Sequence, residues 1–400
     1  IAGNITPKEV YPMREYVIMT DSCCDLTDHM AKELELTVVP LTVHIDGHDY
    51  PNLLDGSAIS FEDFYGKIRG GVLATTAAAN VGQFQEAMRP ILAAGKSALL
   101  PAVPAVLVLL VLLLHGTDIE SACIAAQDMK EEFPDANIYV VDSLSASLGQ
   151  GLLLYLTVQK KREGLSAQEL VQWVEDNKLH IDHWFTVDDL NYLKMGGRLS
   201  AGAAFFGSML SIKPVMHTSD EGKLVPVSKV RGRKASLKAL IDKIAELGIE
   251  PSEQVMFICH ADCEVEARAV AEEMKARYGV KEVYINYIGP VIGSHTGPNT
   301  MGIFFVGTQD NNDAGGRGMD WLELKIDTSH AGLDAVTDML EQQGVTGVMI
   351  DDEADFQSFQ IEERRVGKDV ELGGRRIIKK KKKKINDEKE GEEVNMRMRG

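Results

Sequence analysis

The chain has 400 residues, of which 44% are hydrophobic and 26% are charged, a balance typical of a globular protein with two or three domains. Its formal net charge of -18 argues against a general nucleic-acid-binding protein, because phosphate recognition needs a basic face. Its five cysteines are an odd number and two of them, Cys23 and Cys24, are adjacent, so no disulfide framework is indicated. A reducing cytoplasm is therefore the expected compartment.

The first half of the chain alternates between strand-like and helix-like segments. Residues 1–15 lack the pattern of a secretory signal and are expected to be an N-terminal extension. Strands are predicted at 16–20, 37–45 and 138–141, and helices at 25–34, 61–68, 81–94, 119–132, 150–162 and 167–178. Asp25 or Thr27 can cap the first helix, and Asn80 can cap the third. This alternation indicates a mostly parallel sheet with helices on both faces.

One segment, 98–114, imitates a membrane span, because all 17 of its residues are apolar. This length is at the lower limit of the roughly 17–25 residues that a spanning helix needs. Pro101 and Pro104 fall near its start and leave 105–114 as the unbroken apolar core. A buried strand with an unusual lead-in fits these residues better than a transmembrane helix, and no stable membrane insertion is expected.

The second half of the chain is richer in strands. Strands are predicted at 184–187, 215–217, 224–229, 254–259, 283–288 and 302–306, and helices at 233–247 and 265–278. The Asp-Glu-Gly sequence at 220–222 is a hairpin-turn signal between two of these strands. Hairpins combined with helical crossovers indicate a mixed sheet. The sequence therefore predicts an α/β protein with two domains, at 16–180 and 181–308.

The character of the sequence changes after Gly307. Residues 309–318 are polar and glycine-rich and are expected to be a linker. Residues 319–359 begin a small strand–helix–strand unit that is similar to the start of ribosomal-protein methyltransferases, although it lacks a glycine-rich cofactor loop. Two joined reading frames would explain this change. Residues 360–400 contain six consecutive lysines among other charges, and a disordered charged tail is expected there.

Four short motifs follow one another along the chain. They are Thr-Asp-Ser at 20–22, Thr-Thr-Ala-Ala-Ala at 75–79, Gly-Gly-Arg-Leu-Ser at 196–200 and Gly-Ser-His-Thr-Gly-Pro at 293–298. Together they resemble the DegV family over about 16–307. The resemblance implies a three-layer α/β domain packed on a second α/β domain, with a long-chain fatty acid buried between or inside them. It also implies a carrier that presents this ligand to a separate fatty acid kinase, with no catalytic residue, no metal and no cofactor.

Thr-Asp-Ser follows the first strand, at the edge where open α/β sheets bind ligands. The turn could simply cap the next helix, whereas the resemblance implies that Asp21 and Ser22 support the loops around the ligand head. Thr75 and Thr76 precede a helix, where a hydroxyl is either a cap or a donor to a carboxylate. Counting back from Phe84, Thr76 takes the place of the family's first threonine, and Thr75 lies beside it.

Arg198 and His295 are further candidate contacts of the ligand carboxylate. An arginine in a turn is either solvated or available to an anion, and the resemblance places Arg198 before a helix that lines the cleft between the domains. His295 lies in a glycine-bounded loop and can donate a hydrogen bond to a carboxylate, or accept one once that group is phosphorylated. The family's Gly-Pro-Gly becomes Gly297-Pro298-Asn299, which preserves the loop if Asn299 adopts a positive φ.

The stretch 97–119 departs from the family pattern. A strand followed by a serine loop is expected before the helix at 119–132, but His115 stands where the ligand-binding serine should be. A compensated pair of frameshifts would explain the departure, and it would cost the chain one ligand contact. His115 is kept as the fourth candidate for binding the carboxylate.

Arg231, Arg233 and Lys234 form a basic cluster on an acidic domain, and this cluster is expected to dock the kinase or a phosphate group. Two alternatives to a carrier remain open. One is a hydrolase or phosphotransferase that uses Ser22 or His295, and the other is a product of a fused or frameshifted reading frame that binds nothing. A monomer is expected, and no metal site is indicated because paired Cys-x-x-Cys motifs are absent.

Overall fold

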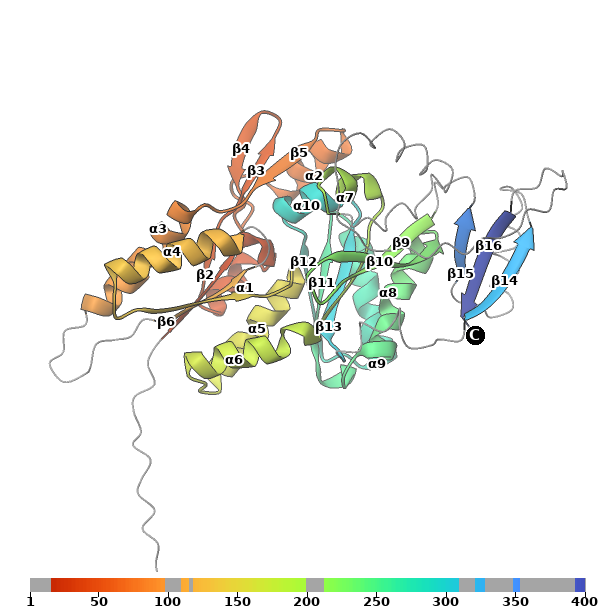
Figure 1. Cartoon of the computed structure of the whole chain (residues 1–400). Helices are drawn as coiled ribbons and strands as arrows, with labels where there is room; N and C mark the ends of the chain where they lie inside the picture. The colour runs from red at the N-terminus through yellow and green to blue at the C-terminus, as the bar shows by residue number, and fades with distance from the viewer. Residues whose placement is uncertain are drawn as a thin grey trace, which may run out of the picture.

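A computed structural model describes residues 16–97, 109–114, 118–198, 212–308, 321–327, 348–352 and 393–399. Figure 1 shows an α/β part formed by the first half of the chain, a second part built on a larger sheet, and a small sheet formed by strands near the C-terminus. The expected α/β fold with a mostly parallel sheet and a mixed sheet is confirmed.

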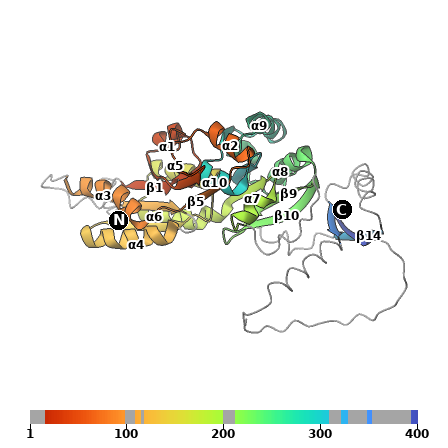
Figure 2. The same ribbon diagram turned by 90° about the horizontal axis from the view of Figure 1, so that it is seen from above.

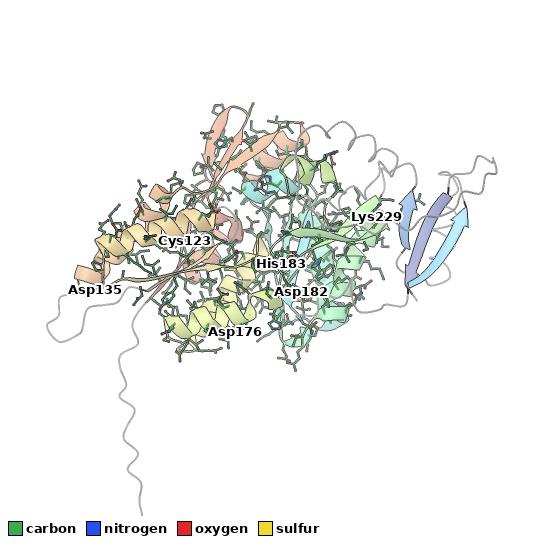
Figure 3. All side chains as sticks on the ribbon, viewed as in Figure 1. Cys123, Asp135, Asp176, Asp182, His183 and Lys229 are labelled. Carbon is green, nitrogen blue, oxygen red and sulfur yellow. The ribbon has the colours of Figure 1, made fainter. Side chains whose placement is uncertain are left out.

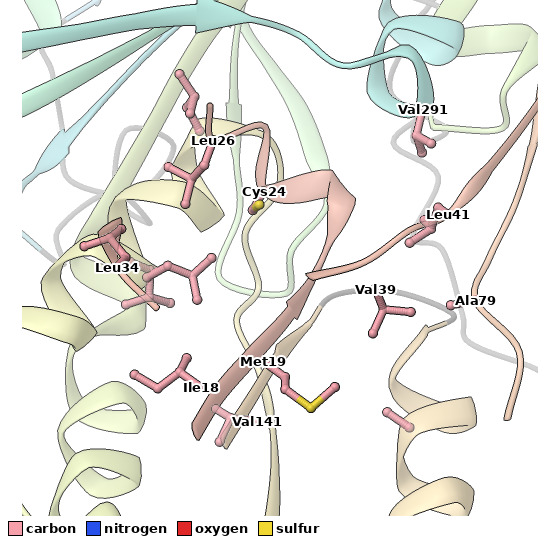
Figure 4. Close-up of a cluster of buried hydrophobic side chains, with 14 of the residues drawn as sticks. Ile18, Met19, Cys24, Leu26, Leu34, Val39, Leu41, Ala79, Val141 and Val291 are labelled. Atoms are coloured by element: carbon pink, nitrogen blue, oxygen red, sulfur yellow. The ribbon is translucent and has the colours of Figure 1, made fainter. Parts of the chain in front are cut away.

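The first sheet is parallel and has the strand order β2-β1-β6-β7. Its strands are β1 (Val17–Asp21), β2 (Leu36–Val39), β6 (Leu109–Leu114) and β7 (Asn137–Asp142). Ile18, Met19 and Val141 are buried in one hydrophobic cluster, which Figure 4 shows around β1. Parallel sheets are covered on both faces, and the apolar runs of these strands provide the surface that is buried.

The apolar segment 98–114 contributes strand β6. This strand pairs with β1 on one side and with β7 on the other, so it lies in the interior of the sheet. Such a position tolerates an unbroken run of Leu and Val, and the expected strand is confirmed over Leu109–Leu114. The lead-in at 98–108 lies outside the described residues. Among the residues that the structure describes, no helix is both long and apolar enough to span a membrane.

A separate antiparallel sheet has the order β4-β3-β5. It consists of β3 (Thr42–Ile45), β4 (His48–Pro51) and β5 (Ala74–Ala77). The prediction of one strand over 37–45 is wrong, because Pro40 lacks the N–H of a continuing ladder and the chain passes from β2 into a different sheet. Asp46 and Gly47 have φ values of 55° and 73°, as the two-residue turn between β3 and β4 requires.

The helices of the first half are α1 (Asp28–Glu33), α2 (Phe61–Arg69), α3 (Val81–Ser97), α4 (Asp118–Glu132), α5 (Leu148–Arg162) and α6 (Ala167–Asn177). Side-chain caps begin α1, α2, α3 and α6, whereas α5 begins without a side-chain cap hydrogen bond. The Thr27 hydroxyl accepts a hydrogen bond from the Met30 N–H, so Thr27 rather than Asp25 caps α1. Asn80 and Gln83 accept from each other's backbone N–H at the start of α3, so the predicted cap Asn80 is confirmed.

The second sheet is mixed and has the order β10-β9-β8-β13-β11-β12. Its strands are β8 (Ile181–Thr186), β9 (Ile212–Thr218), β10 (Leu224–Arg231), β11 (Val255–His260), β12 (Glu282–Tyr287) and β13 (Met301–Val306). Its helices are α7 (Leu190–Met195), α8 (Arg233–Leu247), α9 (Glu264–Tyr278) and α10 (Pro290–Thr296). Strands β11 and β12 pair in parallel, whereas the other neighbouring strands of this sheet are antiparallel. The predicted hairpin between β9 and β10 is confirmed.

Helix α5 joins the cores of the two large sheets. It contacts β8, β11 and β13, and its Leu152 belongs to the same buried cluster as Phe304 of β13. Gly149 on α5 packs against His183 on β8, where an added Cβ would overlap the imidazole ring. Figure 3 labels His183 and Asp182 at this junction. One hydrophobic cluster therefore spans the expected domain boundary at residue 180.

A third sheet has the order β14-β16-β15. It consists of β14 (Trp321–Asp327), β15 (Val348–Asp352) and β16 (Glu393–Arg399). β14 and β15 fall where strands of the unit at 319–359 are expected, and the segment between them lies outside the described residues. β16 falls in the expected disordered tail, so the structure departs from that expectation over seven residues. Val394, Met396 and Met398 alternate with polar residues, which is the period of a strand.

We expect Gly149→Ala to lower the free energy of unfolding by about 1–3 kcal/mol, because the added methyl group must displace His183 from a close-packed junction. Gly66→Ala is the matched control, since Gly66 is also helical but a Cβ there meets nothing within 4 Å. The control should be neutral or stabilising by up to about 1 kcal/mol. Thermal and urea unfolding would measure both effects, and equal effects of the two substitutions would contradict the packing argument.

Candidate functional site

Thr76 and His295 meet although 219 residues separate them in the sequence. Thr76 Oγ1 lies 2.9 Å from His295 Nε2, within hydrogen-bond distance, and the tautomer of the ring decides which group donates. Thr76 lies on β5, where it pairs with Val43 of β3, and His295 lies in the last turn of α10. Figure 2 shows α10 next to β5 and α7, and contacts between these elements support that view.

The sequence prediction that His295 lies in a loop is wrong, because Pro290–Thr296 forms helix α10. Pro290 occupies the first helical position, where its fixed φ favours the helix and its missing N–H costs nothing. Gly297 ends the helix at a φ of 74°. The glycines on both sides of this segment suggested a loop, but the seven residues between Gly289 and Gly297 are enough for about two helical turns.

Two buried side chains from the first half of the chain fix the start of α10. One carboxylate oxygen of Asp25 accepts a hydrogen bond from the Gly289 N–H at 2.9 Å. The Tyr65 hydroxyl donates to the Ile288 carbonyl at 2.7 Å. Gly289 and Gly293 allow this approach, because a Cβ at either position would come within 2.5 Å of the Asp25 carboxylate or the Tyr65 hydroxyl. The position of His295 therefore depends on residues more than 220 positions earlier.

The Gly-Gly-Arg turn lies against the other edge of the His295 ring. Gly196 caps α7, and a Cβ at this residue would collide with His295 Nδ1. Gly197 has a φ of 68°, which turns the chain back, and the Arg198 guanidinium donates to the Gly196 carbonyl at 2.5 Å. Arg198 is exposed. The structure thus brings together three of the four predicted carboxylate contacts, and the fourth, His115, lies outside the described residues.

Burial, together with the positive charge of Arg198, lowers the pKa of His295 to about 4. The imidazole is therefore neutral at physiological pH, with one nitrogen that donates and one that accepts. If Nε2 carries the hydrogen, Thr76 accepts it and keeps its own hydroxyl hydrogen for a ligand. A hydroxyl, a neutral imidazole and an exposed guanidinium together form a site with hydrogen-bond donors and no buried positive charge.

Asp118 supports the strand that carries Thr76. Its carboxylate accepts a hydrogen bond from the Ala79 N–H at 2.7 Å, just beyond the end of β5. Asn80 already caps α3, which leaves Thr76 free of that role, and Thr75 points to solvent on the strand. Sequence reasoning missed Asp118, because an acidic residue in the first turn of α4 indicates only a favourable helix start.

Asp21 and Ser22 are both buried and tie the end of β1 to neighbouring loops. Asp21 accepts from the Cys23 N–H at 2.6 Å. The Ser22 hydroxyl oxygen accepts from the Leu41 N–H at 3.1 Å and from the Asn52 amide at 2.9 Å. Leu41 directly precedes β3, the strand that pairs with β5, so Ser22 contacts the segment that positions the threonine strand. These contacts resemble a structural support more than an activated nucleophile, which needs an adjacent base.

Three buried carboxyl groups lie near the C-terminal end of β1. Burial raises the pKa of Asp21 to about 7, and the charge of Asp118 adds to this effect. Burial also raises the pKa of Asp25 to about 7, although hydrogen bonds from Ser147 and Gly289 oppose it. Burial raises the pKa of Asp118 to about 6 against one backbone hydrogen bond. These groups take up protons close to physiological pH.

The members of the basic cluster differ in their exposure to solvent. Arg231 and Lys234 are exposed at the end of β10 and the start of α8. The Arg233 guanidinium instead donates to the Glu266 carboxylate at 2.9 Å and 3.1 Å and contacts the Cys263 thiol. Arg233 is therefore held by Glu266 and is only half-buried, whereas Arg231 and Lys234 are exposed. In the part of the chain that the structure describes, no group of three His, Cys, Asp or Glu residues could hold a metal ion.

Comparison with known proteins gives the family of this chain. The family model described as "Uncharacterised protein, DegV family" matches residues 15–308. A DegV domain-containing protein of Clostridium perfringens is 42% identical over 295 residues, which cover 74% of this chain and 98% of the relative. The chain belongs to the DegV family.

Solved structures of this family share the fold. A structure titled as fatty acid binding of a DegV family protein from Thermus thermophilus is 26% identical, with a TM-score of 0.63, and covers 74% of this chain and 100% of its own. A structure described as a stearic acid-binding protein from Eubacterium ventriosum is 25% identical, with a TM-score of 0.62, and covers 74% and 99% respectively.

We expect Asp25→Asn to become more stabilising, relative to the unaltered protein, as the pH rises from 5 to 8. The folded state retains a proton on Asp25 up to a pKa of about 7, whereas the unfolded state releases it near 3.8. The unaltered protein therefore loses stability as the pH rises from the unfolded pKa towards the folded pKa of Asp25. The asparagine variant does not, because its amide has no proton to release in this pH range. An asparagine can still accept from Gly289 and donate to Ser147.

The expected change in the difference between the two unfolding free energies is about 1–3 kcal/mol, since one pKa unit corresponds to about 1.4 kcal/mol. Urea unfolding at several pH values would measure it. Taking the difference cancels the titration of groups that are the same in both proteins. A difference that stays constant between pH 5 and pH 8 would contradict the raised pKa.

Proposed function

We propose that this protein is a carrier that buries a long-chain fatty acid and presents its carboxylate at Thr76 and His295 to a separate fatty acid kinase. The observation that carries the proposal is the contact between Thr76 and His295, with the turn of Arg198 packed against the same ring. This contact joins a strand of the first half to a helix of the second half, at the place where two family motifs coincide.

The chemistry of the three side chains suits a carboxylate. Moving a carboxylate out of water is unfavourable unless hydrogen bonds replace its hydration. When Nε2 of the neutral His295 ring donates to Thr76, the Thr76 hydroxyl hydrogen can supply such a bond without a second buried charge, and Arg198 adds a cation at the solvent side. We propose that Asp21, Ser22 and Thr75 support this site without contacting the ligand. Asp21 and Ser22 would act through the loop before β3, and Thr75 would act as part of β5.

The acyl chain would supply most of the affinity. Burial of each methylene contributes about 0.8 kcal/mol, so a long chain contributes on the order of 10 kcal/mol before the costs of binding are subtracted. Fatty acid binding in the Thermus thermophilus relative and stearic acid binding in the Eubacterium ventriosum protein support the same ligand class for this chain.

A carrier needs no nucleophile of its own, because the kinase would transfer the phosphoryl group to the presented carboxylate. The engagement of Ser22 with Leu41 and Asn52 supports binding over hydrolysis by Ser22. Arg231 and Lys234 remain our candidates for docking the kinase, while Arg233 is paired with Glu266. We further propose a cytoplasmic monomer with domains at 16–180 and 181–308.

We retain as a hypothesis that residues 309–400 derive from a second reading frame. The family match ends at residue 308, and the unit at 319–359 resembles the start of ribosomal-protein methyltransferases. The strands β14 and β15 support a folded segment there, but no methyl-donor site is proposed.

We expect Thr76→Val to weaken fatty acid binding by about tenfold or more, because a hydrogen bond to a charged group is worth about 1.5–3 kcal/mol. Thr75→Val is the matched control, since Thr75 is the exposed neighbour on the same strand and the same chemical change is made. Displacement of a fluorescent fatty acid from the delipidated full chain would measure both affinities. If the two variants bind equally well, Thr76 does not contact the carboxylate.

A further inference from the structure

Asn299 lies three residues after the end of α10, and its side chain forms a hydrogen bond on each side. Its φ is 62°, so the expected left-handed conformation is confirmed. The amide oxygen accepts a hydrogen bond from the Arg69 guanidinium at 2.8 Å. The amide nitrogen donates to the Asp188 carboxylate at 2.8 Å. A glycine would preserve this backbone conformation, but it could make neither side-chain bond.

Arg69, Asn299 and Asp188 thus form a hydrogen-bonded bridge. Each of these three residues lies close in sequence to one residue of the proposed carboxylate site. Arg69 ends α2 and is followed by the short connection to β5, which carries Thr76. Asp188 lies two residues before α7, which leads into the Gly-Gly-Arg turn. Asn299 follows α10, which carries His295. The three segments that supply the site therefore converge on one amide group.

The two ends of the bridge contact the second half of the chain, Arg69 at the loop after β11 and Asp188 at β9. The Arg69 guanidinium also donates to the Asp262 side chain and to the Asp262 carbonyl, each at 3.1 Å. Asp188 forms an ion pair with Lys213 of β9 at 2.7 Å. Burial raises the pKa of Asp188, but hydrogen bonds from Lys213 and Asn299 outweigh this and lower it overall, so the carboxylate stays ionised.

The bridge lies at the surface of the molecule rather than in its core. Asp188, Lys213, Asp262 and Asn299 line an open groove with a volume of about 640 Å³. Arg69 is itself exposed. Substitutions at Asn299 can therefore disturb the spacing of the three segments without creating a cavity in a hydrophobic cluster.

We propose that Asn299 is a positioning residue that sets the spacing of Thr76, His295 and Arg198 through its bonds to Arg69 and Asp188. It touches no ligand, and it acts by holding the ends of α2, α10 and the segment before α7 in one arrangement. This inference rests on the proposed function, because it concerns the same carboxylate site.

Asn299→Gly tests the proposal, because it keeps the left-handed backbone and removes only the amide. We expect the affinity for a fluorescent fatty acid to fall about three- to tenfold, mainly through faster dissociation, with the unfolding transition little changed. In the lipid-free protein, the pKa of His295 measured by NMR should rise from about 4 towards its ordinary value of 6.5, because burial and the nearby Arg198 both lower it. Glu250→Gly is the matched control, since Glu250 also has a positive φ, of 44°, but lies outside this bridge.

Exchanging the amide and the carboxylate between positions 299 and 188 distinguishes a positioning role of Asn299 from a general loss of stability. Asn299→Asp places a second carboxylate against Asp188 and should weaken binding, whereas adding Asp188→Asn restores one donor and one acceptor and should recover most of the affinity. Recovery supports the proposal. If Asn299→Gly and Asn299→Asp both leave fatty acid affinity and the His295 titration unchanged, the proposal is overturned. If the unaltered chain binds no fatty acid, the proposed function fails, and the His295 titration of the lipid-free variants still decides whether Asn299 positions the ring.

Discussion

The buried contacts that fix the start of helix α10 are the constraint on which the site depends. Asp25 and Tyr65 come from the first half of the chain, and they hold the backbone at Gly289 and Ile288 of the second half. Both bonds are buried, so breaking either would leave a polar group without water to replace its partner. The seven-residue helix that follows transmits this placement to His295, and so to its contact with Thr76. The two halves of the chain meet through these bonds as well as through the cluster around α5.

The charges of this region follow from the same burial. Acidic groups at the end of β1 are shielded from water, which favours their protonated forms, and His295 is shielded in a way that favours its neutral form. The site therefore contains few fixed charges apart from Arg198 at its exposed edge. A fatty acid brings one negative charge and a long apolar chain. A neutral group of hydrogen-bonding side chains suits such a ligand better than a strongly cationic one, because it leaves no buried charge unpaired in the empty protein.

Much of the architecture was accessible from the sequence, because strong periodicity and caps mark most elements. The alternation of strands and helices in the first half and the hairpin between β9 and β10 were predicted correctly. The break at Pro40 was missed because β-branched residues on both sides of it suggested one strand. Helix α10 was missed because its flanking glycines suggested a loop, although Pro290 is a good first helical residue.

The site was accessible in part. The motifs identified Thr76, His295 and Arg198, and the structure brings these three residues together. Sequence could not reveal Asp25 and Asp118 as supports, because their partners lie hundreds or tens of residues away and no local pattern encodes such pairs. The bridge made by Asn299 was also hidden, since only its tolerance of a positive φ can be read from the sequence. His115 lies outside the described residues, and its role stays a prediction.

Native mass spectrometry of the purified full chain, followed by denaturation and lipid analysis, tests the central claim most directly. The account predicts one fatty acid bound to each chain, retained under native conditions and released on unfolding. A folded protein that carries no fatty acid, and that takes none up when it is supplied, would contradict the carrier function. The family membership would then describe the fold of this chain but not its activity.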